Sequence, residues 1–383
     1  MGRIDLPDSA TPDVSVLVVL TADAARAARS LRSIAEAAPP VATEVVLVLN
    51  GATPDVRALI DEQVRGARLV DAPVDLGLAA AWRQGLQLAR GPRISLLHED
   101  SFPRAAWLVP LVETLDARPH AGVVGARLLH PDGRHQNDGW VLWRDAHVSV
   151  LSRELAQRDV APPRPVDYVS SAALLTDRAL LAELDLPDET WFPAVYTDSD
   201  LSRAVWASGR VVLHDPRSVV SHGKLAMVQP GGPPNRGRHL PAFLYARNRE
   251  RFLVKWRAEL ATRPVRSEGT WPDSVPPDEL RAALALTAER AAAIESGPPP
   301  TPQDAVPPAQ DAAKLTVDDA ALERATLRRA ELDKEFTTWL SAQLDAATQE
   351  IAALRAHAEA VQHEAERAVA ANRELAAELE RLS

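Results

Sequence analysis

The chain has 383 residues, 46% of them hydrophobic and 25% charged, which is enough for one large globular domain with extensions. A formal net charge of −10 argues against a nucleic-acid-binding protein, and the absence of cysteine excludes disulfides, cysteine-ligated metal sites and thiol catalysis. The N-terminal residues lack an apolar signal core and no segment has the roughly 18 apolar residues of a spanning helix, so we expect a cytoplasmic protein with at most peripheral membrane contact.

Strands and helices alternate along the first hundred residues. A β-branched run predicts a strand over 14–20, followed by apolar residues at helical spacing. The pattern then predicts a strand over 44–49, a helix over 56–64, a short strand at 69–70 and a helix over 78–89. This alternation predicts an α/β fold with a mostly parallel sheet and helices on both faces.

The stretch 93–103, R-I-S-L-L-H-E-D-S-F-P, combines a short apolar strand with a polar ending. His98, Glu99 and Asp100 follow the strand at its carboxyl end, where open α/β sheets bind their ligands. A carboxylate there can hold Mg²⁺ against a diphosphate, because Mg²⁺ prefers oxygen ligands. An acidic loop in which Asp100 or Ser101 caps the next helix explains the same residues.

The rest of the first 223 residues continues the alternation. Further elements are predicted as a helix over 105–115, a hairpin around the turn 131–133, a loop over 151–165, a strand leading into a helix over 166–181, and a last pair of strands over 211–223. Asp198 and Asp200 stand two apart at the start of another helix. Either acid can serve as a helix N-cap, so their spacing alone leaves a structural and a catalytic interpretation open.

Nine motifs follow one another in a characteristic order. They are T-A-D, L-N-G-A-T, D-L-G-L-A-A-A, L-L-H-E-D-S-F-P, P-D-G-R, V-D-Y-V-S-S-A, D-E-T-W-F, D-S-D-L-S-R and V-V-S-H-G. Together they resemble family 2 glycosyltransferases of the GT-A fold, closest to bacterial rhamnosyltransferase-like members that build cell-surface polysaccharide. The resemblance covers about residues 13–257 and implies a GT-A domain over 1–262, Rossmann-like and specific for nucleotide-diphospho-sugars.

The resemblance implies an inverting transfer from a nucleoside-diphosphate sugar to a saccharide or lipid-linked saccharide acceptor, with Mg²⁺ or Mn²⁺ as the cofactor. Asp100 ends the motif that positions the metal on the diphosphate, and His222 falls where the family can offer a histidine to the metal. Asp198 matches the general base and Asp200 the second acid of the same motif. Positions that match contacts to the nucleotide-sugar are Thr21, Asp23, Asn50, Asp75 and Glu99.

Five positions depart from the family pattern. Leu49 replaces an aspartate that contacts the nucleotide, and Thr197 replaces the acid that usually precedes the base. Ala80, Trp82 and Ser171 stand where glycine, asparagine and glycine are common. These departures leave a second interpretation open, in which a catalytically degenerate GT-A domain acts as a binding or scaffold module through its helical tail.

Three features occupy the C-terminal third of the chain. Apolar and basic residues over 240–260 predict a basic amphipathic helix, which either lies on the inner membrane surface or packs with a solvated arginine face. Residues 263–313 are proline-rich and predict a linker that does not fold compactly, with one Ala-rich helix over about 278–296.

Residues 314–383 predict a coiled coil. The heptad seam consists of Leu340, Leu344, Ala347, Ile351, Leu354, Ala358, Val361, Ala365, Ala368, Asn372, Leu375, Leu379 and Leu382. With Leu340 at position d, Asn372 falls at position a, where a buried asparagine fixes the register of a coiled coil. We therefore expect a homo-oligomer, and the alternative is a single amphipathic helix that folds back on the catalytic domain.

Overall fold

The computed structural model describes residues 2–37, 40–151, 162–223, 236–267, 275–301 and 308–382. The chain divides into two compact units, Met1–Arg328 and Arg329–Ser383, which are called unit 1 and unit 2 below. Unit 1 holds the sheet and all of the predicted site residues.

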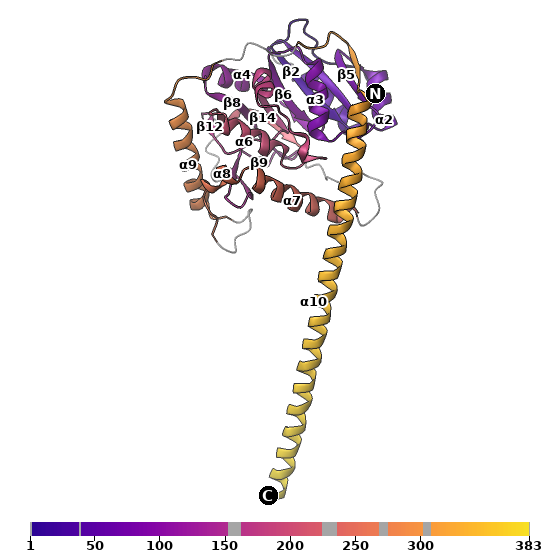
Figure 1. The fold of residues 1–383 in the computed structure, drawn as a ribbon, viewed down its shortest axis with the longest axis vertical. Coiled ribbons are helices and arrows are strands. Elements are labelled where there is room, and N and C mark those ends of the chain that lie inside the picture. The colour runs from indigo at the N-terminus through magenta and orange to yellow at the C-terminus, as the bar shows by residue number, and fades with distance from the viewer. Residues whose placement is uncertain are drawn as a thin grey trace. The chain divides into compact units, whose positions relative to one another are not determined.

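A mixed sheet forms the centre of unit 1 (Figure 1). Among the described residues its strands follow the order β12-β14-β8-β13-β6-β2-β3-β5-β15, with β7 beside β14 and β9 beside β8. The strands are β1 (Ile4–Asp5), β2 (Val14–Leu20), β3 (Thr43–Asn50), β4 (Val64–Arg65), β5 (Ala67–Ala72), β6 (Arg93–His98), β7 (Ser101–Pro103), β8 (Ala121–Leu129), β9 (His135–Asn137), β10 (Trp140–Leu142), β11 (Val148–Val150), β12 (Arg164–Pro165), β13 (Ala173–Asp177), β14 (Val211–His222) and β15 (Lys314–Thr316).

The described helices alternate with these strands through the first half of unit 1, as predicted. They are α1 (Ala24–Glu36), α2 (Pro54–Gln63), α3 (Leu78–Leu88), α4 (Leu108–Ala117), α5 (Arg178–Glu183), α6 (Thr197–Ala207), α7 (Arg236–Lys255), α8 (Arg257–Ala261), α9 (Pro277–Glu295) and α10 (Asp319–Leu382), with a 3₁₀ turn, η1, at Glu189–Trp191. The parallel pairs of β2 with β3, β2 with β6 and β3 with β5 confirm the predicted parallel sheet.

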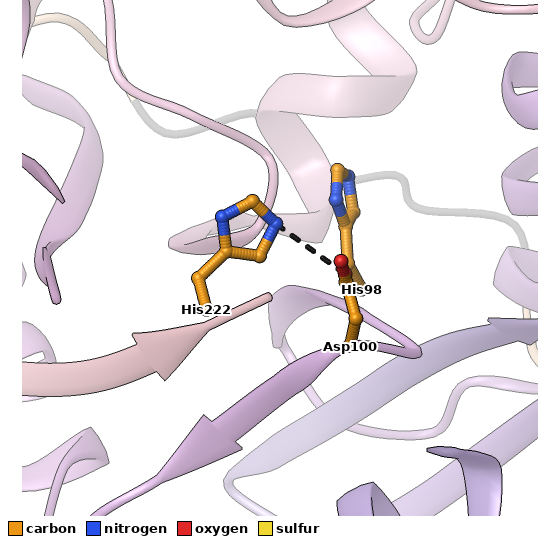
Figure 2. Close-up of side chains that lie close together, drawn as sticks. All are labelled: His98, Asp100 and His222. Atoms are coloured by element: carbon orange, nitrogen blue, oxygen red, sulfur yellow. Dashed lines mark ion pairs between the residues drawn. The ribbon is translucent and has the colours of Figure 1, made fainter. Parts of the chain in front are cut away.

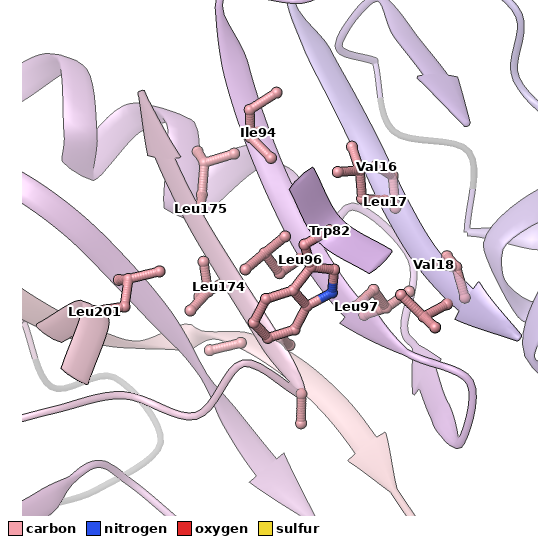
Figure 3. Packing of buried hydrophobic residues seen from close by; sticks show 14 of the residues in the cluster. Val16, Leu17, Val18, Trp82, Ile94, Leu96, Leu97, Leu174, Leu175 and Leu201 are labelled. Atoms are coloured by element: carbon pink, nitrogen blue, oxygen red, sulfur yellow. The ribbon is translucent and has the colours of Figure 1, made fainter. Parts of the chain in front are cut away.

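The core extends along the sheet from Val45 of β3 to Val211 of β14, and Figure 3 shows the part around β2, β6 and β13. Helix α3 packs on β2, β3 and β5, where Gly85 lets the helix approach closely: an added Cβ would lie 3.0 Å from Leu17 Cδ2 and 3.2 Å from Val48 Cγ2. Trp82 of α3 is only 1% exposed. Burying an apolar side chain of this size stabilises the fold by roughly 1.5–3 kcal/mol, so Trp82 is a core residue rather than a site residue.

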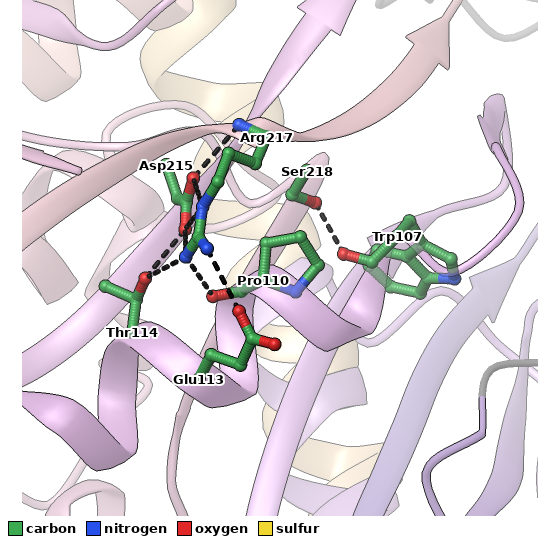
Figure 4. A network of polar contacts seen from close by, with 7 residues as sticks. All are labelled: Trp107, Pro110, Glu113, Thr114, Asp215, Arg217 and Ser218. Carbon is green, nitrogen blue, oxygen red and sulfur yellow. Dashed lines mark hydrogen bonds and ion pairs between the residues drawn. The ribbon is translucent and has the colours of Figure 1, made fainter. Parts of the chain in front are cut away.

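The predicted last pair of strands is a single strand, β14, with an interruption. It runs parallel to β8, and its register shifts between Asp215 and Val219, where Pro216 has no N–H to donate. Side chains hold the interruption against α4 (Figure 4): Thr114 Oγ1 donates to Asp215 Oδ2 at 2.7 Å, and Arg217 Nη2 donates to the same oxygen at 2.8 Å. The end of β14 is thereby fixed beside β7.

The proline-rich stretch after α8 differs from the prediction, because α9 is part of the core of unit 1. Leu280, Ala283 and Ala291 are buried, and the Thr287 hydroxyl donates to the buried Asp167 carboxylate at 2.9 Å. Strand β15 then pairs parallel with β5. The expectation that 263–313 does not fold compactly is wrong for α9, where the prolines mark the helix start and small alanines allow close packing. The predicted domain boundaries at 262 and 313 therefore differ from the boundary between unit 1 and unit 2, which follows Arg328.

The basic helix predicted over 240–260 is α7 followed by α8. Phe252 is fully buried, and the Arg249 side chain donates to the Asp145 carbonyl at 2.8 Å. Arg247 donates to the Phe192 carbonyl. These contacts fit the packing alternative, while membrane contact stays a prediction. None of the helices in the described residues combines enough length and apolarity to cross a bilayer.

Unit 2 is the greater part of the long helix α10. Its large apolar side chains are exposed, among them Leu344 (67%), Ile351 (50%), Leu354 (61%) and Val361 (51%). The helical conformation agrees with the prediction, and its pairing into a coiled coil stays a prediction. Most of the predicted loop over 151–165 lies outside the described residues. The part at its C-terminal end that is described contains the short strand β12.

Candidate active site

The carboxyl end of β6 carries the residues predicted to hold a metal. After His98 the chain turns into β7, which pairs antiparallel with the end of β14. In this register His222 lies opposite Ser101, and the Gly223 N–H donates to the Asp100 carbonyl at 2.8 Å. The backbone pairing therefore brings Asp100 and His222 together from distant parts of the sequence.

Three side chains converge here, as Figure 2 shows. One potential ligand atom from each of His98, Asp100 and His222 lies within 4.8 Å of the others, and His222 Nε2 is 3.3 Å from Asp100 Oδ1. The rings of His98 and His222 have centroids 5.7 Å apart and are tilted by 60°. Of the consecutive residues His98, Glu99 and Asp100, the first and the third join the cluster, whereas the Glu99 side chain bonds Thr21.

This cluster fits a divalent cation. Asp100 is 2% exposed, and among the described residues neither of its carboxylate oxygens has a hydrogen-bond partner. A buried carboxylate without compensation costs several kcal/mol, and a bound cation removes that cost. One carboxylate and two imidazoles can hold a first-row divalent cation such as Mn²⁺, because imidazole is a common ligand of first-row transition metals and carboxylate suits Mn²⁺.

The two histidines are prepared to act as ligands. Burial, with a smaller contribution from His222, lowers the pKa of His98 from 6.5 to about 4, so its imidazole is neutral at pH 7. His222 Nδ1 lies 2.7 Å from Gln136 Oε1, and because that oxygen only accepts, Nδ1 carries the proton. His222 Nε2 faces Asp100 at 3.3 Å, and Gln136 has the orienting role that partners of metal-bound histidines commonly have.

Glu99 is tied to the end of β2. Its carboxylate accepts hydrogen bonds from the Thr21 N–H and the Thr21 hydroxyl, both at 2.8 Å. Burial raises the pKa of Glu99, and the two bonds from Thr21 oppose that shift. Both residues were predicted to contact the nucleotide, and in the structure they hold the β2 and β6 loop ends together.

The other predicted nucleotide contacts form part of the same loop edge. Asp23 caps α1, accepting from the Arg26 N–H at 2.9 Å, and this bond is the main cause of its lowered pKa. Asn50 Nδ2 donates to Asp75 Oδ1 at 2.9 Å, and that oxygen also accepts the Gly77 N–H at 2.9 Å. The loops after β3 and β5 are therefore joined by the residues predicted to bind the nucleotide.

The predicted base, Asp198, lies in the first turn of α6. It is half-buried, and its carboxylate accepts from the Ser199 N–H at 3.0 Å and the Ser171 N–H at 3.4 Å. Burial raises the pKa of Asp198. The Ser171 hydroxyl in turn lies 3.0 Å from His98 Nε2. Ser171 thus contacts both the predicted base and the histidine cluster, which places the two segments in one site.

Asp200 has different surroundings from Asp198. It is fully buried, and its carboxylate accepts from Lys255 Nζ at 2.9 Å and Trp256 Nε1 at 2.7 Å. Burial raises the pKa of Asp200 and the neighbouring Lys255 opposes that shift. The carboxylate is therefore engaged in fixing α6 to the end of α7, and only Asp198 of the pair is accessible.

Comparison with known proteins identifies the family. The sequence model described as glycosyl transferase family 2 matches residues 15–175. This part of the chain belongs to glycosyl transferase family 2. The mixed sheet of unit 1 is the GT-A fold of this glycosyltransferase family. A comparison with curated proteins found no match.

Several solved structures are similar to the chain at low sequence identity. GalNAc-T7 with UDP, GalNAc and Mn²⁺ is 16% identical over 72% of this chain, which spans about half (55%) of that protein, with a TM-score of 0.49. The mannosyltransferase PcManGT from Pyrobaculum calidifontis with GDP-Man and Mn²⁺ is 19% identical over 89% and 87% of the two chains, with a TM-score of 0.44. S. aureus TarS is 16% identical over 55% and 60%, with a TM-score of 0.40.

Two departures from the family 2 pattern have structural explanations. Leu49 ends β3 with 3% exposure and is part of the apolar core, so it offers no acceptor to a nucleotide. Thr197 is 3% exposed, and its hydroxyl has no partner among the described residues. Neither position therefore offers an acidic side chain.

Sequence reasoning missed three residues that contact the predicted site residues. His98 was noted as a potential ligand but only Asp100 and His222 were assigned to the metal. No local sequence pattern pointed to Gln136 as a partner of His222, because the pairing of β9 with β8 brings the two residues together. Lys255 was considered only as part of a basic helix face, and its pairing with Asp200 depends on the packing of α7.

Proposed function

We propose that the protein is an inverting, metal-dependent glycosyltransferase that moves a sugar from a nucleoside-diphosphate sugar to a cell-surface polysaccharide or lipid-linked acceptor. The observation that carries this proposal is the buried Asp100 carboxylate, which faces His98 and His222 without a hydrogen-bond partner among the described residues. Mn²⁺ or Mg²⁺ is the proposed cofactor, and His98, Asp100 and His222 are its proposed ligands.

When bound, such a cation stabilises the negative charge that develops on the departing diphosphate. Thr21, Asn50 and Asp75 lie at or just after the carboxyl ends of β2, β3 and β5, and open α/β sheets bind nucleotides at these ends. In this proposal the loops position the donor with its diphosphate next to Asp100.

Asp198 is the proposed general base. It takes the proton of the acceptor hydroxyl while the oxygen forms its bond to the anomeric carbon and the bond from that carbon to the diphosphate oxygen breaks. A single displacement of this kind inverts the anomeric configuration. Burial raises the pKa of Asp198, which increases its affinity for the proton that it must accept. Asp200, by its pairing with Lys255, keeps α6 and therefore Asp198 in place.

The test is transfer or donor hydrolysis with a panel of nucleoside-diphosphate sugars in the presence of Mn²⁺. Wild type should consume at least one donor, and Asp198→Asn should bind the same donor without consuming it. The reaction should stop when the metal is chelated and resume when Mn²⁺ is restored. Consumption that continues unchanged in chelator, or in Asp198→Asn, contradicts the assignment.

A degenerate GT-A domain that acts as a binding or scaffold module is the second candidate. Leu49 and the internally paired Asp200 favour it, because each removes an acidic group that the family uses. This candidate predicts that neither wild type nor Asp198→Asn consumes any donor while both bind nucleotide. Nucleotide binding measured by calorimetry alongside the donor panel therefore separates the two functions.

The exposed apolar seam of α10 supports a further proposal, self-association. Leu344, Ile351 and Leu354 are large apolar side chains at heptad spacing that lie exposed in the single chain. Burial of such a seam against a second copy is favourable, and we expect a homo-oligomeric coiled coil. In this proposal the enzyme is cytoplasmic and meets a lipid-linked acceptor at the inner membrane surface.

A further inference from the structure

Residues 192–196, called the left-handed bend below, have a strained backbone directly before α6. Val195 has a φ of 71° and Tyr196 a φ of 69°, in the left-handed region that residues other than glycine rarely adopt. Val195 is β-branched, so its side chain makes this conformation especially costly. A strained backbone of this kind persists only where the surrounding structure fixes it. The left-handed bend therefore depends on contacts from other segments.

Asn248 of α7 holds the middle of the left-handed bend. Its Nδ2 donates to the carbonyls of Ala194 and Val195, both at 2.9 Å, and Asn248 is fully buried. Arg247 Nε donates to Asn248 Oδ1 at 2.9 Å. Because a carbonyl only accepts and a guanidinium only donates, these contacts fix the orientation of the amide. Helix α7 is thus tied to the strained backbone through a side chain whose donor and acceptor roles are settled.

The left-handed bend sets the start of the helix that carries the proposed base. Tyr196 is the N-cap residue of α6, and its carbonyl accepts the Asp200 N–H at 2.8 Å. The Tyr196 hydroxyl donates to the Ala146 carbonyl at 2.8 Å, so this residue is held by both its main chain and its side chain. Asp198 lies two residues further along, in the first turn of α6, and its position therefore depends on the conformation of the bend.

We propose that Asn248 is a positioning residue for Asp198: its two hydrogen bonds keep the bend left-handed, and the bend directs the first turn of α6 so that the Asp198 carboxylate accepts the Ser171 N–H. This inference rests on the proposed function, because it takes Asp198 as the base that removes the acceptor proton. Without Asn248 the strained backbone is free to relax, which displaces the first turn of α6. A displacement of about 1 Å in a catalytic group can lower turnover by about 10²-fold.

The test compares variants of the full chain in turnover of the nucleoside-diphosphate sugar that wild type consumes fastest, with Mn²⁺ present. Asn248→Ala should lower turnover by about 10²-fold and leave calorimetric donor affinity unchanged, because only proton removal is affected. Val195→Gly should restore turnover about tenfold in the Asn248→Ala background, because glycine adopts a positive φ without strain. Thr176→Val is the matched control: it removes an equally buried hydrogen bond, from the Thr176 hydroxyl to the Gly122 carbonyl, and should keep wild-type turnover.

Hydrogen exchange followed by mass spectrometry tests the bend without any donor. Asn248→Ala should speed exchange at the start of α6, including exchange of the Asp200 N–H, while β6 exchanges at wild-type rates. If far-ultraviolet circular dichroism shows that Asn248→Ala does not fold, Asn248→Ser takes its place. Its shorter side chain should give the same changes in exchange and turnover.

Wild-type exchange at the start of α6, or wild-type turnover, in Asn248→Ala overturns the inference and leaves the transferase proposal standing. A loss of donor affinity as large as the loss of turnover overturns it as well, and so does turnover that Val195→Gly does not restore. A wild type that consumes no donor refutes the transferase proposal, and the exchange at the start of α6 then decides by itself whether Asn248 holds the bend.

Discussion

Replacing Asp100 by asparagine should have opposite effects on stability with and without metal. The carboxylate is 2% exposed, and its oxygens have no hydrogen-bond partner among the described residues, so the metal-free protein retains a buried charge that no hydrogen bond stabilises and that has His222 Nε2 at 3.3 Å. An asparagine side chain has nearly the same shape without that charge. Removing a buried charge that no hydrogen bond stabilises relieves a desolvation penalty of several kcal/mol, of which we expect at least about 1 kcal/mol to appear in the free energy of unfolding.

Mn²⁺ should stabilise the wild-type protein and should not stabilise Asp100→Asn. At a Mn²⁺ concentration of about 100 times the dissociation constant, a ligand that binds only the native state stabilises it by about 2.7 kcal/mol. With a urea m-value of about 3 kcal/mol/M, this raises the wild-type midpoint by about 0.9 M, whereas Asp100→Asn should gain nothing. In chelator, the Asp100→Asn midpoint should exceed the wild-type midpoint by about 0.3 M.

The assay is urea unfolding followed by tryptophan fluorescence, in EDTA and in Mn²⁺. Asp177→Asn is the control, because Asp177 ends β13 opposite Arg93 and so lies at the other edge of the same sheet. The control should respond to Mn²⁺ as wild type does. The reasoning is refuted if Asp100→Asn unfolds at lower urea than wild type in EDTA, or if Mn²⁺ raises its midpoint as much as that of wild type.

Three further predictions follow from other parts of the chain. Asp198→Asn should lower donor turnover by about 10²–10⁴-fold and leave calorimetric donor affinity unchanged, since only proton removal is lost. Burial lowers the pKa of His214 from 6.5 to about 3, so the unfolded state binds a proton that the native state does not. The contribution of His214 to the free energy of unfolding should therefore fall by about 2 kcal/mol between pH 7 and pH 5. In His214→Gln, the free energy of unfolding measured in urea should fall by about 2 kcal/mol less than in wild type over this pH range; an equal fall in both proteins would disprove the prediction. Removal of 329–383 should lower the mass measured by light scattering to that of a monomer without unfolding the sheet, and an unchanged number of chains per particle would exclude α10 as the association element.

The alternation of strands and helices made the fold predictable. Runs such as 14–20 and 44–49 are mostly apolar, as is typical of strands buried on both faces, and each is followed by apolar residues at helical spacing. Local sequence carries this information because a period of 2 or 3.6 depends only on neighbouring residues. The order of the motifs added the GT-A topology and pointed to Asp100, Asp198 and His222.

Contacts between distant segments could not be predicted in this way. Proline content gave the wrong expectation for α9, because Leu280 and Ala283 are buried by packing that no local pattern encodes. Asp198 and Asp200 are two apart in the same helix turn, yet Lys255 engages only Asp200. Identical residue types therefore received different roles from the segments that pack against them.

The sequence by itself determined the α/β alternation, the helical tail and the acidic residues at the strand ends. Tertiary structure decided which of these residues share a site: β7 pairs with β14 and brings His222 to Asp100, while the turn before β13 places Ser171 between His98 and Asp198. The physical reason is that a hydrogen bond or a metal site requires atoms within about 3 Å of one another, and strand pairing across the sheet, not proximity along the chain, sets those distances.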